Sequence, residues 1–413
     1  MCINAELEQF PVNKNRPIAY QQWLRVVIKK MPHLSKPQAV VLGMWSFAIA
    51  MTHHCGLSTA VVFLGEILEQ PENTIRERLR QWYNGRVDKN GRKRREIQVE
   101  NSFVPLLSWI LSWWSSEEKS LVLAADASTL GQRFTLLVIS VVYRGCGIPV
   151  AWKILRANEK GSWKPYWLKL LDSLQEGVPS DWLVIVTTDR GLYADWLYEA
   201  IEQLGWHPFM RINHQGYYQS SPQEQFVPLS GLITQVGQSW SGKVTCFKTN
   251  SLSCTLLAQW DCGYADPWLI VTDLSPQQAQ ICWYGMRSWI ECLFKDIKRG
   301  GFGWHHTKMN DPQRAERLWL AIAVATLFLV SIGGEAEANL PASSLPPLEQ
   351  MSSSAETKEN PSIHEKQILL PKTNSTRFLS CFRRGFLIIL ASAIKGMPLP
   401  TGRFSPDFPP APG

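Results

Sequence analysis

Two apolar, β-rich segments that each carry an aspartate at their end constrain the fold more than any other feature of this sequence. The segment LVLAADAST contains Asp126, and the segment DWLVIVTTDRG contains Asp189. A buried strand holds a carboxylate at its exposed end rigidly at the edge of a sheet. If the two strands lie side by side, the two carboxylates come within reach of one metal ion. For one such aspartate alone, a role in a turn or a helix cap is the ordinary alternative.

The segments around these strands predict an α/β fold, a mixed sheet with helices on its faces. FTLLVISVVYRG and IPVAWKIL predict a pair of strands joined by a tight turn, and HPFMRIN and PWLIVTDL predict two more. SWKPYWLKLLDSL and YADWLYEAIEQLG have the spacing of amphipathic helices, which gives the order β-β-β-α-β-α-β for the first part. We therefore predict a core formed by residues 116–213 and 267–334. Residues 214–266 show no helical period and predict a small β insertion.

Residues 1–115 are predicted to be helical. SKPQAVVLGMWSFAIAM predicts a buried helix, and STAVVFLGEILEQPENTIRERLRQW predicts two helices joined by a turn, the second capped by Asn73. Such a pair resembles a helix-turn-helix, whose second helix can enter a major groove. Beyond it, Asn90-Gly91 predicts a hairpin turn and thus a basic β-ribbon. The alternative is an ordinary helical bundle with a solvated basic loop.

The positive charge of the chain is concentrated in one stretch. The chain has 42 basic and 35 acidic residues, a net charge of +7. Residues 76–95 hold nine Lys and Arg against two acids, so they carry the whole excess and leave 33 basic and 33 acidic residues elsewhere. A local excess of this kind is typical of a surface that binds a polyanion. The predicted DNA contacts in this stretch are Arg76, Arg78, Arg80, Lys89, Arg92, Lys93, Arg94 and Arg95.

Cysteine usage and hydropathy limit the compartment and the partners. Nine cysteines without a C-x-x-C pair favour a reduced intracellular setting over a disulfide framework or a zinc site. No signal peptide is visible, and the apolar run 318–334 is shorter than the ~20 residues that span a bilayer. Because Asp311 and Pro312 predict a capped helix start before this run, we expect a buried core helix and no membrane partner.

The composition changes beyond Gly334. Residues 335–375 are rich in Pro, Ser, Ala and Glu, which predicts a disordered linker. Residues 376–413 predict a C-terminal helical tail, within which 376–395 is a candidate for a dimer contact. Truncation or a frameshift is an alternative origin for these segments.

Residues 283–301, WYGMRSWIECLFKDIKRGG, predict one amphipathic helix that stops at glycines. At about 100° per residue, Tyr284, Arg287, Glu291 and Lys298 fall on one narrow stripe. Such a stripe is suited to a surface that binds a phosphate and a metal together. The alternative is a solvated polar face with i,i+4 ion pairs.

Glu291 adds a third carboxylate to the two strand-end aspartates if this helix packs across the edge of the sheet. Oxygen ligands of this kind suit Mg²⁺ or Mn²⁺. Two such ions about 3.5–4 Å apart can activate an attacking oxygen and stabilise a leaving one.

The spacing Tyr284-x₂-Arg287-x₃-Glu291-x₆-Lys298 matches in full a signature of the DDE transposases of bacterial cut-and-paste insertion sequences. AADAS and TTDRG also resemble the first two carboxylate segments of that group, and the resemblance covers roughly residues 120–334. It implies an RNase H-like core with a β-strand insertion between the second Asp and the Glu, preceded by a helical DNA-binding domain.

The resemblance also implies roles for these residues. Asp126, Asp189 and Glu291 would be catalytic ligands of two Mg²⁺ or Mn²⁺ ions. Arg287 and Lys298 would hold DNA phosphates, and Tyr284 would contact a phosphate or stack on a distorted base. Trp240 in the insertion would stack on a flipped base, or else belong to the core of the insertion.

The activity that the resemblance implies is metal-dependent cleavage at the ends of the element and transfer of the freed 3′-OH into target DNA. The expected partners are terminal inverted repeats, target DNA and a second copy of the chain in a synaptic complex, within the bacterial cytoplasm at the nucleoid. The alternatives are an inactive DNA-binding remnant or repressor of the same family and an RNase H-like resolvase. Asp273 also ends an apolar strand, but we expect it to be structural.

Overall fold

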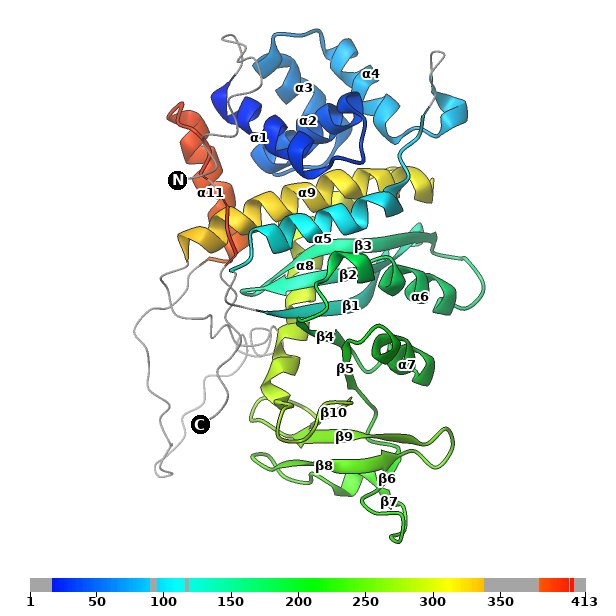
Figure 1. The fold of residues 1–413 in the computed structure, drawn as a ribbon. Coiled ribbons are helices and arrows are strands. Elements are labelled where there is room, and N and C mark those ends of the chain that lie inside the picture. The colour runs from blue at the N-terminus through cyan, green and yellow to red at the C-terminus, as the bar shows by residue number, and fades with distance from the viewer. Residues whose placement is uncertain (1–16, 90–94, 116–118, 338–378, 401, 405–413) are drawn as a thin grey trace, which may run out of the picture.

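A mixed ten-stranded sheet forms the centre of the protein (Figure 1). The computed structural model describes residues 17–89, 95–115, 119–337, 379–400 and 402–404. The first five strands are β1 (Ser120–Leu130), β2 (Phe134–Tyr143), β3 (Cys146–Arg156), β4 (Leu183–Thr188) and β5 (His207–Arg211).

These five strands are arranged in the order β3-β2-β1-β4-β5. β2 is antiparallel to both of its neighbours, whereas β1, β4 and β5 are parallel to one another. Every residue of β2 is buried, which explains why this strand is apolar on both faces. This order and these directions are the RNase H-like arrangement, as predicted.

The predicted β insertion extends the same sheet. Its strands, with the one that follows, are β6 (Tyr217–Gln219), β7 (Val227–Pro228), β8 (Ser239–Cys246), β9 (Leu252–Gln259) and β10 (Trp268–Thr272). They continue from β5 in the order β10-β9-β8-β6-β7, all antiparallel. Because β10 returns beside β5, with Ile270 paired to Arg211 and Val271 to Met210, the insertion is joined to the core by backbone pairing.

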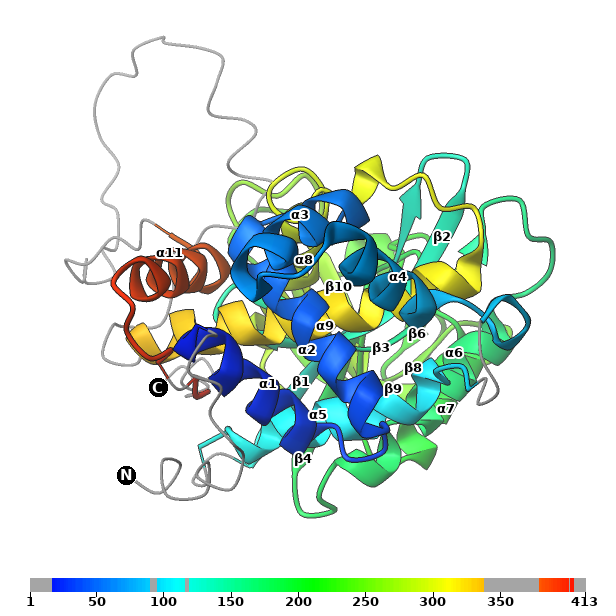
Figure 2. The same cartoon turned by 90° about the horizontal axis from the view of Figure 1, so that it is seen from above.

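Helices cover both faces of the sheet. α6 (Lys164–Asp172) and α7 (Asp195–Gln203) lie on one face, and α8 (Trp289–Ile297) lies on the other against β1, β2 and β3 (Figures 1 and 2). α8 approaches β3 at Gly147, where an added Cβ would lie 3.0 Å from the Cβ of Leu293. The absence of a side chain at this position lets the helix pack closely against the strand.

The N-terminal helices pack above the long helix α9 (Pro312–Ala336) (Figures 1 and 2). They are α1 (Ile18–Lys30), α2 (Lys36–Thr52), α3 (Leu57–Leu68) and α4 (Glu72–Tyr83), and α5 (Phe103–Ser112) lies between them and the sheet. A capping box of Ser35 and Gln38 starts α2. The predicted cap at Asn73 is wrong, because α4 already begins at Glu72 after Pro71.

The predicted basic β-ribbon is also wrong in its described part. Residues 86–88 form the short 3₁₀ helix η1 (Arg86–Asp88), and residues 95–98 are not in a strand. The predicted turn residues, within 90–94, lie outside the described residues. The other 3₁₀ segments are η2 (Val99–Ser102), η3 (Gln175–Gly177), η4 (Leu229–Gly231), η5 (Ile281–Ser288) and η6 (Trp304–His306).

α9 is the buried core helix that the apolar run predicts. The side chain of Asp311 accepts hydrogen bonds from the backbone N–H groups of Gln313 and Arg314, which fixes the start of the helix. α9 is long and apolar enough to span a membrane, but 94% of its most apolar window is buried inside the protein. Its neighbours α2, β3 and α11 (Cys381–Ile394) supply that burial.

The C-terminal helix α11 lies against α9 beside the N-terminal helices (Figure 1). A Cβ at Gly385 would lie 1.9 Å from the carbonyl oxygen of Leu329, so the two helices touch through their backbones. The buried carboxylate of Glu337 accepts a hydrogen bond of 2.7 Å from Arg384 Nε. Most of the predicted linker, residues 338–375, lies outside the described residues.

Candidate active site

Asp126 and Asp189 lie side by side on two neighbouring interior strands of the core sheet. Asp189 directly follows β4, as predicted, but the prediction that Asp126 ends a strand is wrong, because β1 continues to Leu130 through its pairing with β2. β1 and β4 are parallel, and Ala125 pairs with Thr188. Asp126 and Asp189 are the next residues on each strand, so the register places them opposite each other. Asp126 Oδ1 accepts a hydrogen bond of 2.7 Å from the N–H of Ala127, and Asp189 Oδ1 accepts one of 3.0 Å from Leu192.

Glu291 joins this pair from α8, and the guanidinium of Arg287 lies among all three carboxylates. Arg287 Nη2 is 2.8 Å from Asp126 Oδ2 and 3.5 Å from Asp189 Oδ2. Arg287 Nη1 forms an ion pair with Glu291 Oε1. Acidic residues separated by 63 and 102 positions in the sequence therefore contact one cation.

The segment that carries Arg287 and Glu291 is not the single helix that the sequence predicts. Residues 281–288 form the 3₁₀ helix η5, and α8 begins only at Trp289. Glu291 is in the first turn of α8, where the partial positive charge of a helix N-terminus favours a carboxylate. Ile290, Leu293 and Ile297 form the buried face of α8, which sets the orientation of Glu291 toward the sheet edge.

Tyr284 does not share an exposed stripe with these residues. Its side chain is 5% exposed and packs edge-on against Trp268, with the ring centroids 5.1 Å apart. Burial raises the pKa of the Tyr284 hydroxyl to about 12, against the opposing effects of Arg287 and of a hydrogen bond from Arg211. The predicted single stripe is therefore wrong, because the 3₁₀ turn directs the Tyr284 ring inward, where it packs against Trp268. A contact of Tyr284 with DNA stays a prediction.

Lys298 lies at the end of α8 and is bound to the end of β1. Its Nζ donates to Ser128 Oγ at 2.7 Å and to the carbonyl oxygen of Thr129 at 3.0 Å. Burial lowers the pKa of this ammonium group. Lys298 thus fixes the strand two residues beyond Asp126, in addition to any contact with a ligand.

Burial dominates the electrostatics of the site. It raises the pKa of Asp126 to about 6, an effect that Arg287 opposes and that the neighbouring carboxylates Asp189 and Glu291 reinforce. The Asp126 and Arg287 side chains are each 15% exposed, whereas Asp189 and Glu291 are 38% and 39% exposed. The site is therefore closed on the side of Asp126 and open to solvent on the side of the other two carboxylates.

Comparison with known proteins agrees with this geometry. The family model of the transposase DDE domain matches residues 119–328, half of the chain, and that range includes all three carboxylates. The chain belongs to the DDE transposase family.

No curated protein sequence matches this transposase. Among solved structures, it is similar to the cryo-EM structure of a piggyBac transposase synaptic complex with hairpin DNA. The two share 11% identity over 86% of this chain and 88% of that chain, with a TM-score of 0.34. A likeness at this score supports no conclusion about the transposase described here.

The three carboxylates of this transposase have the donor chemistry of a divalent metal site. The oxygens Asp126 Oδ2, Asp189 Oδ2 and Glu291 Oε1 all face one cation, and hard oxygen ligands are those that Mg²⁺ and Mn²⁺ prefer. As they stand, the carboxylates surround the guanidinium of Arg287. Within the described residues, no three His, Cys, Asp or Glu side chains are placed to hold a metal ion directly. The chemistry of the donor set therefore suits a divalent ion, although the three side chains as they lie are arranged around Arg287.

Two arginines beside the site were not singled out from the sequence. Arg211 ends β5, whose Met210 pairs with Thr188 of β4, so Arg211 lies next to Asp189. It forms an ion pair of 3.0 Å with Asp266, which also pairs with Arg190 at 2.7 Å. The rule that identified the two aspartates, polar residues at the ends of neighbouring parallel strands, applies equally to Arg211.

Asp273 is at the opposite end of the sheet from the site. Its Oδ2 lies 2.8 Å from Nδ1 of His207. His207 pairs with Ile185 near the start of β4, whereas Asp189 follows the end of that strand. The structural role predicted for Asp273 is consistent with this position.

The arginines predicted to contact DNA lie on the outer side of α4. Ile75, Leu79 and Trp82 form the buried side of α4, while Arg78 and Arg80 are exposed and Arg76 is partly exposed. Arg78 Nη1 donates to Gln70 Oε1 at 2.9 Å.

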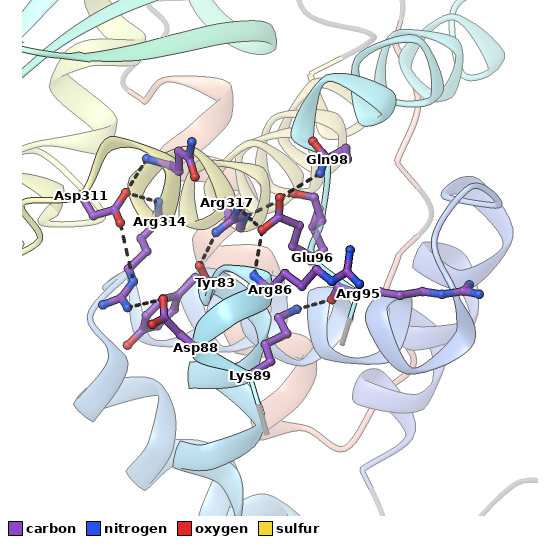
Figure 3. A network of polar contacts seen from close by, with 12 residues as sticks. Tyr83, Arg86, Asp88, Lys89, Arg95, Glu96, Gln98, Asp311, Arg314 and Arg317 are labelled. Atoms are coloured by element: carbon purple, nitrogen blue, oxygen red, sulfur yellow. Dashed lines mark hydrogen bonds and ion pairs between the residues drawn. The ribbon is translucent and has the colours of Figure 1, made fainter. Parts of the chain in front are cut away.

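The loop after α4 is fastened to α9 by the polar network drawn in Figure 3. Glu96 accepts a hydrogen bond of 2.9 Å from the N–H of Arg86, and Lys89 Nζ donates to the carbonyl oxygen of Arg95 at 2.6 Å. The buried Arg317 of α9 pairs with Glu96 at 3.3 Å. The two ends of the basic loop are thus held together, and exposed Arg95 remains beside them.

The other predicted DNA contacts are less defined. Arg92, Lys93 and Arg94 lie outside the described residues. Trp240 of β8 is half-buried and packs against Tyr218 at a centroid distance of 5.9 Å. This contact agrees with the alternative that Trp240 belongs to the packing of the insertion, and its stacking on a base stays a prediction.

Proposed function

We propose that this DDE transposase cuts DNA at the ends of a mobile element and joins the freed 3′-OH to target DNA, with Asp126, Asp189 and Glu291 as its catalytic residues. The observation that carries the proposal is the contact of all three carboxylates with the one guanidinium of Arg287. Three acidic side chains gathered at one sheet edge have no structural need to be there, since they repel one another unless a cation lies between them.

In the proposed reaction the three carboxylates would hold two Mg²⁺ or Mn²⁺ ions. When bound, such ions activate the attacking oxygen and stabilise the leaving oxygen of a phosphodiester. Asp126, rigid within β1, would set the position of the site, and the more exposed Asp189 and Glu291 would face the DNA. Arg287 would bind a phosphate beside the scissile bond, where a cation also offsets the charge of the transition state. Lys298 would hold the end of β1, and a further phosphate when it is released from Ser128.

The proposed substrate is double-stranded DNA that carries the terminal inverted repeats of the element. The arginines of α4 and the basic loop would contact the backbone of that DNA. Their charge is concentrated in one stretch of the sequence, and Arg78, Arg80 and Arg95 are exposed. Pairing of two ends for strand transfer would require a second copy of the chain in a synaptic complex.

The activity can be tested with the purified full-length chain, Mg²⁺ or Mn²⁺, and a DNA fragment that ends in the repeats flanking the gene. Asp126→Asn, Asp189→Asn and Glu291→Gln are each expected to abolish nicking and strand transfer and to leave DNA binding in the absence of metal intact. Asp273→Asn is the matched control, since it alters another strand-end aspartate on the opposite side of the sheet, and it is expected to cleave like the wild type.

The competing hypothesis is a DNA-binding remnant or repressor. Specific binding of the repeats by the wild type without any nicking in either metal would favour it. Cleavage of branched junctions regardless of the end sequence would instead favour a resolvase. Loss of cleavage in Asp273→Asn but not in Asp189→Asn would show that the second carboxylate has been wrongly assigned.

A further inference from the structure

The guanidinium of Arg287 occupies the space toward which the three carboxylates point. Its two terminal nitrogens contact Asp126 Oδ2, Asp189 Oδ2 and Glu291 Oε1, one oxygen from each acid. One oxygen of each acid is thus directed at the guanidinium, and a divalent ion shared by the three acids would have to take the place of Arg287, with the side chains drawn closer together than they now lie. A guanidinium and a divalent ion cannot lie in this space together, because they overlap sterically and their like charges repel.

The same side chain is assigned a second task under the proposed function, that of binding a DNA phosphate. A guanidinium cannot contact all three carboxylates and a phosphate with the same terminal nitrogens. The two tasks are therefore alternative positions of one side chain. Moving from the first to the second removes a positive charge from the carboxylates and leaves their facing oxygens free.

Two features of Arg287 favour such a movement. Within the described residues, the ion pairs of its guanidinium are with the three carboxylates, beside an electrostatic interaction with the buried Tyr284, and its buried Nε has no hydrogen-bond partner. In addition, Arg287 lies near the end of the eight-residue 3₁₀ helix η5, and 3₁₀ runs longer than three or four residues are uncommon because their hydrogen-bond geometry is poor.

We propose that Arg287 couples metal binding to DNA binding. This inference rests on the proposed function. Without DNA, Arg287 neutralises the carboxylates and competes with divalent ions for them. A DNA phosphate draws the guanidinium away, and the carboxylates then bind the metal. Because coupling between two ligands is reciprocal, metal also strengthens DNA binding. The device keeps the free transposase from assembling a hydrolytic centre before its substrate has arrived.

The test measures Mn²⁺ affinity by calorimetry or by the EPR signal of free Mn²⁺, without relying on cleavage. The full-length wild type and Arg287→Gln, which keeps the shape of the side chain and lacks its charge, are compared with and without a short uncleavable duplex from the end of the element. Without DNA, Arg287→Gln is expected to bind Mn²⁺ about tenfold more tightly than the wild type, the usual size of such coupling. DNA is expected to tighten Mn²⁺ binding to the wild type by about the same factor and to leave Arg287→Gln almost unchanged.

Asp126→Asn and Asp189→Asn separate failure of this inference from failure of the proposed function. If both weaken Mn²⁺ binding while Arg287→Gln does not strengthen it, the carboxylate site stands and the coupling is refuted. If neither aspartate variant changes Mn²⁺ binding, the metal site itself is wrongly placed, and the inference falls with it. Arg287→Lys, whose single ammonium cannot reach all three acids, is a second variant with an intermediate expected affinity, and circular dichroism checks that each variant is folded.

Discussion

Arg287 is the residue on which the geometry of the candidate site depends. Two carboxylates about 4 Å apart repel by about 4 kcal/mol at the effective dielectric constant of a protein surface. The contacts of Arg287 with Asp126, Asp189 and Glu291 offset this repulsion. Lys298 acts differently, since it is bound to uncharged oxygens of Ser128 and Thr129. The two cations of the signature thus have separate roles, one within the site and one at its border.

Asp296, a buried carboxyl group in α8, makes the stability of the fold depend on pH. Burial raises its pKa to about 7, and Lys295 opposes the effect. Cys292 of α8 and Cys146 of β3 are the other titratable groups that face it. Because this pKa is above the ordinary value of 3.8, the folded protein holds a proton that the unfolded chain releases between about pH 4 and 7. The free energy of unfolding therefore falls as the pH rises through that range.

Asp296→Asn removes this titration. Near pH 8 the variant is expected to melt at a higher temperature than the wild type, because Asp296 of the wild type is then charged and buried. Near pH 5, where Asp296 is protonated in the folded protein, the difference in melting temperature is expected to be much smaller. Thermal melts at the two pH values measure the difference. An equal gain at both would show that Asp296 does not titrate in this range.

At the scale of secondary-structure elements, the strands could be predicted and two connecting segments could not. Each core strand is a short apolar run between turn residues, so local composition determines it. Residues 283–301 also have a clear helical period, yet their first part forms the 3₁₀ helix η5. The contacts of Tyr284 with Trp268 and of Arg287 with Asp126 override the local preference there, and no local pattern contains those contacts.

The loop after α4 was mispredicted for a similar reason. Asn90-Gly91 favours a hairpin, but the described residues on either side of it do not pair as strands. Both sides are fastened to α9. Arg317 Nη1 donates to the carbonyl oxygen of Tyr83 at 2.8 Å, and its Nε donates to that of Ile97 at 3.2 Å. These partners are more than 200 positions away in the sequence. In the candidate site, likewise, the two aspartates could be predicted from the apolar runs that precede them and Glu291 from the spacing of its segment, whereas the position of Arg287 could not.

Arg317→Ala tests how much this attachment contributes to stability. Its side chain is 5% exposed and pairs with Glu96, so its loss leaves the carbonyl groups of Tyr83 and Ile97 without this donor and removes the cation beside the Glu96 carboxylate. The expected cost is about 3 kcal/mol in the free energy of unfolding, measured by urea denaturation. Arg314→Ala is the control, because Arg314 belongs to the same network but is 37% exposed, and it is expected to cost less than about 1 kcal/mol. Equal losses for the two variants would contradict the account.

At the scale of the whole molecule, the positive charge is concentrated in the N-terminal region, and the carboxylates lie at the edge of the sheet. α9 connects the two, since it packs against α2 and β3 and is tied to the loop after α4 by the network of Figure 3. α9 thus links α4 and the described ends of the loop to the core sheet that carries the three carboxylates.

Removing two exposed arginines of α4 tests whether this region binds DNA. Arg78→Ala with Arg80→Ala is expected to weaken binding to all DNA sequences and to lower the slope of log affinity against log salt by about 2, roughly one for each lost phosphate contact. Fluorescence anisotropy over a range of salt concentrations measures both. Lys119→Ala, at the start of β1 and paired with Asp181, is the control for loss of surface charge. An unchanged slope in the double variant would place the DNA elsewhere.

The most direct test of the account is a crystal structure of the transposase with DNA and Mn²⁺, in which anomalous scattering locates the metal. The expected result is Mn²⁺ bound by oxygens of Asp126, Asp189 and Glu291 together, with Arg287 turned away onto a phosphate. Mn²⁺ bound without these three residues, or the three carboxylates found apart from one another, would contradict it.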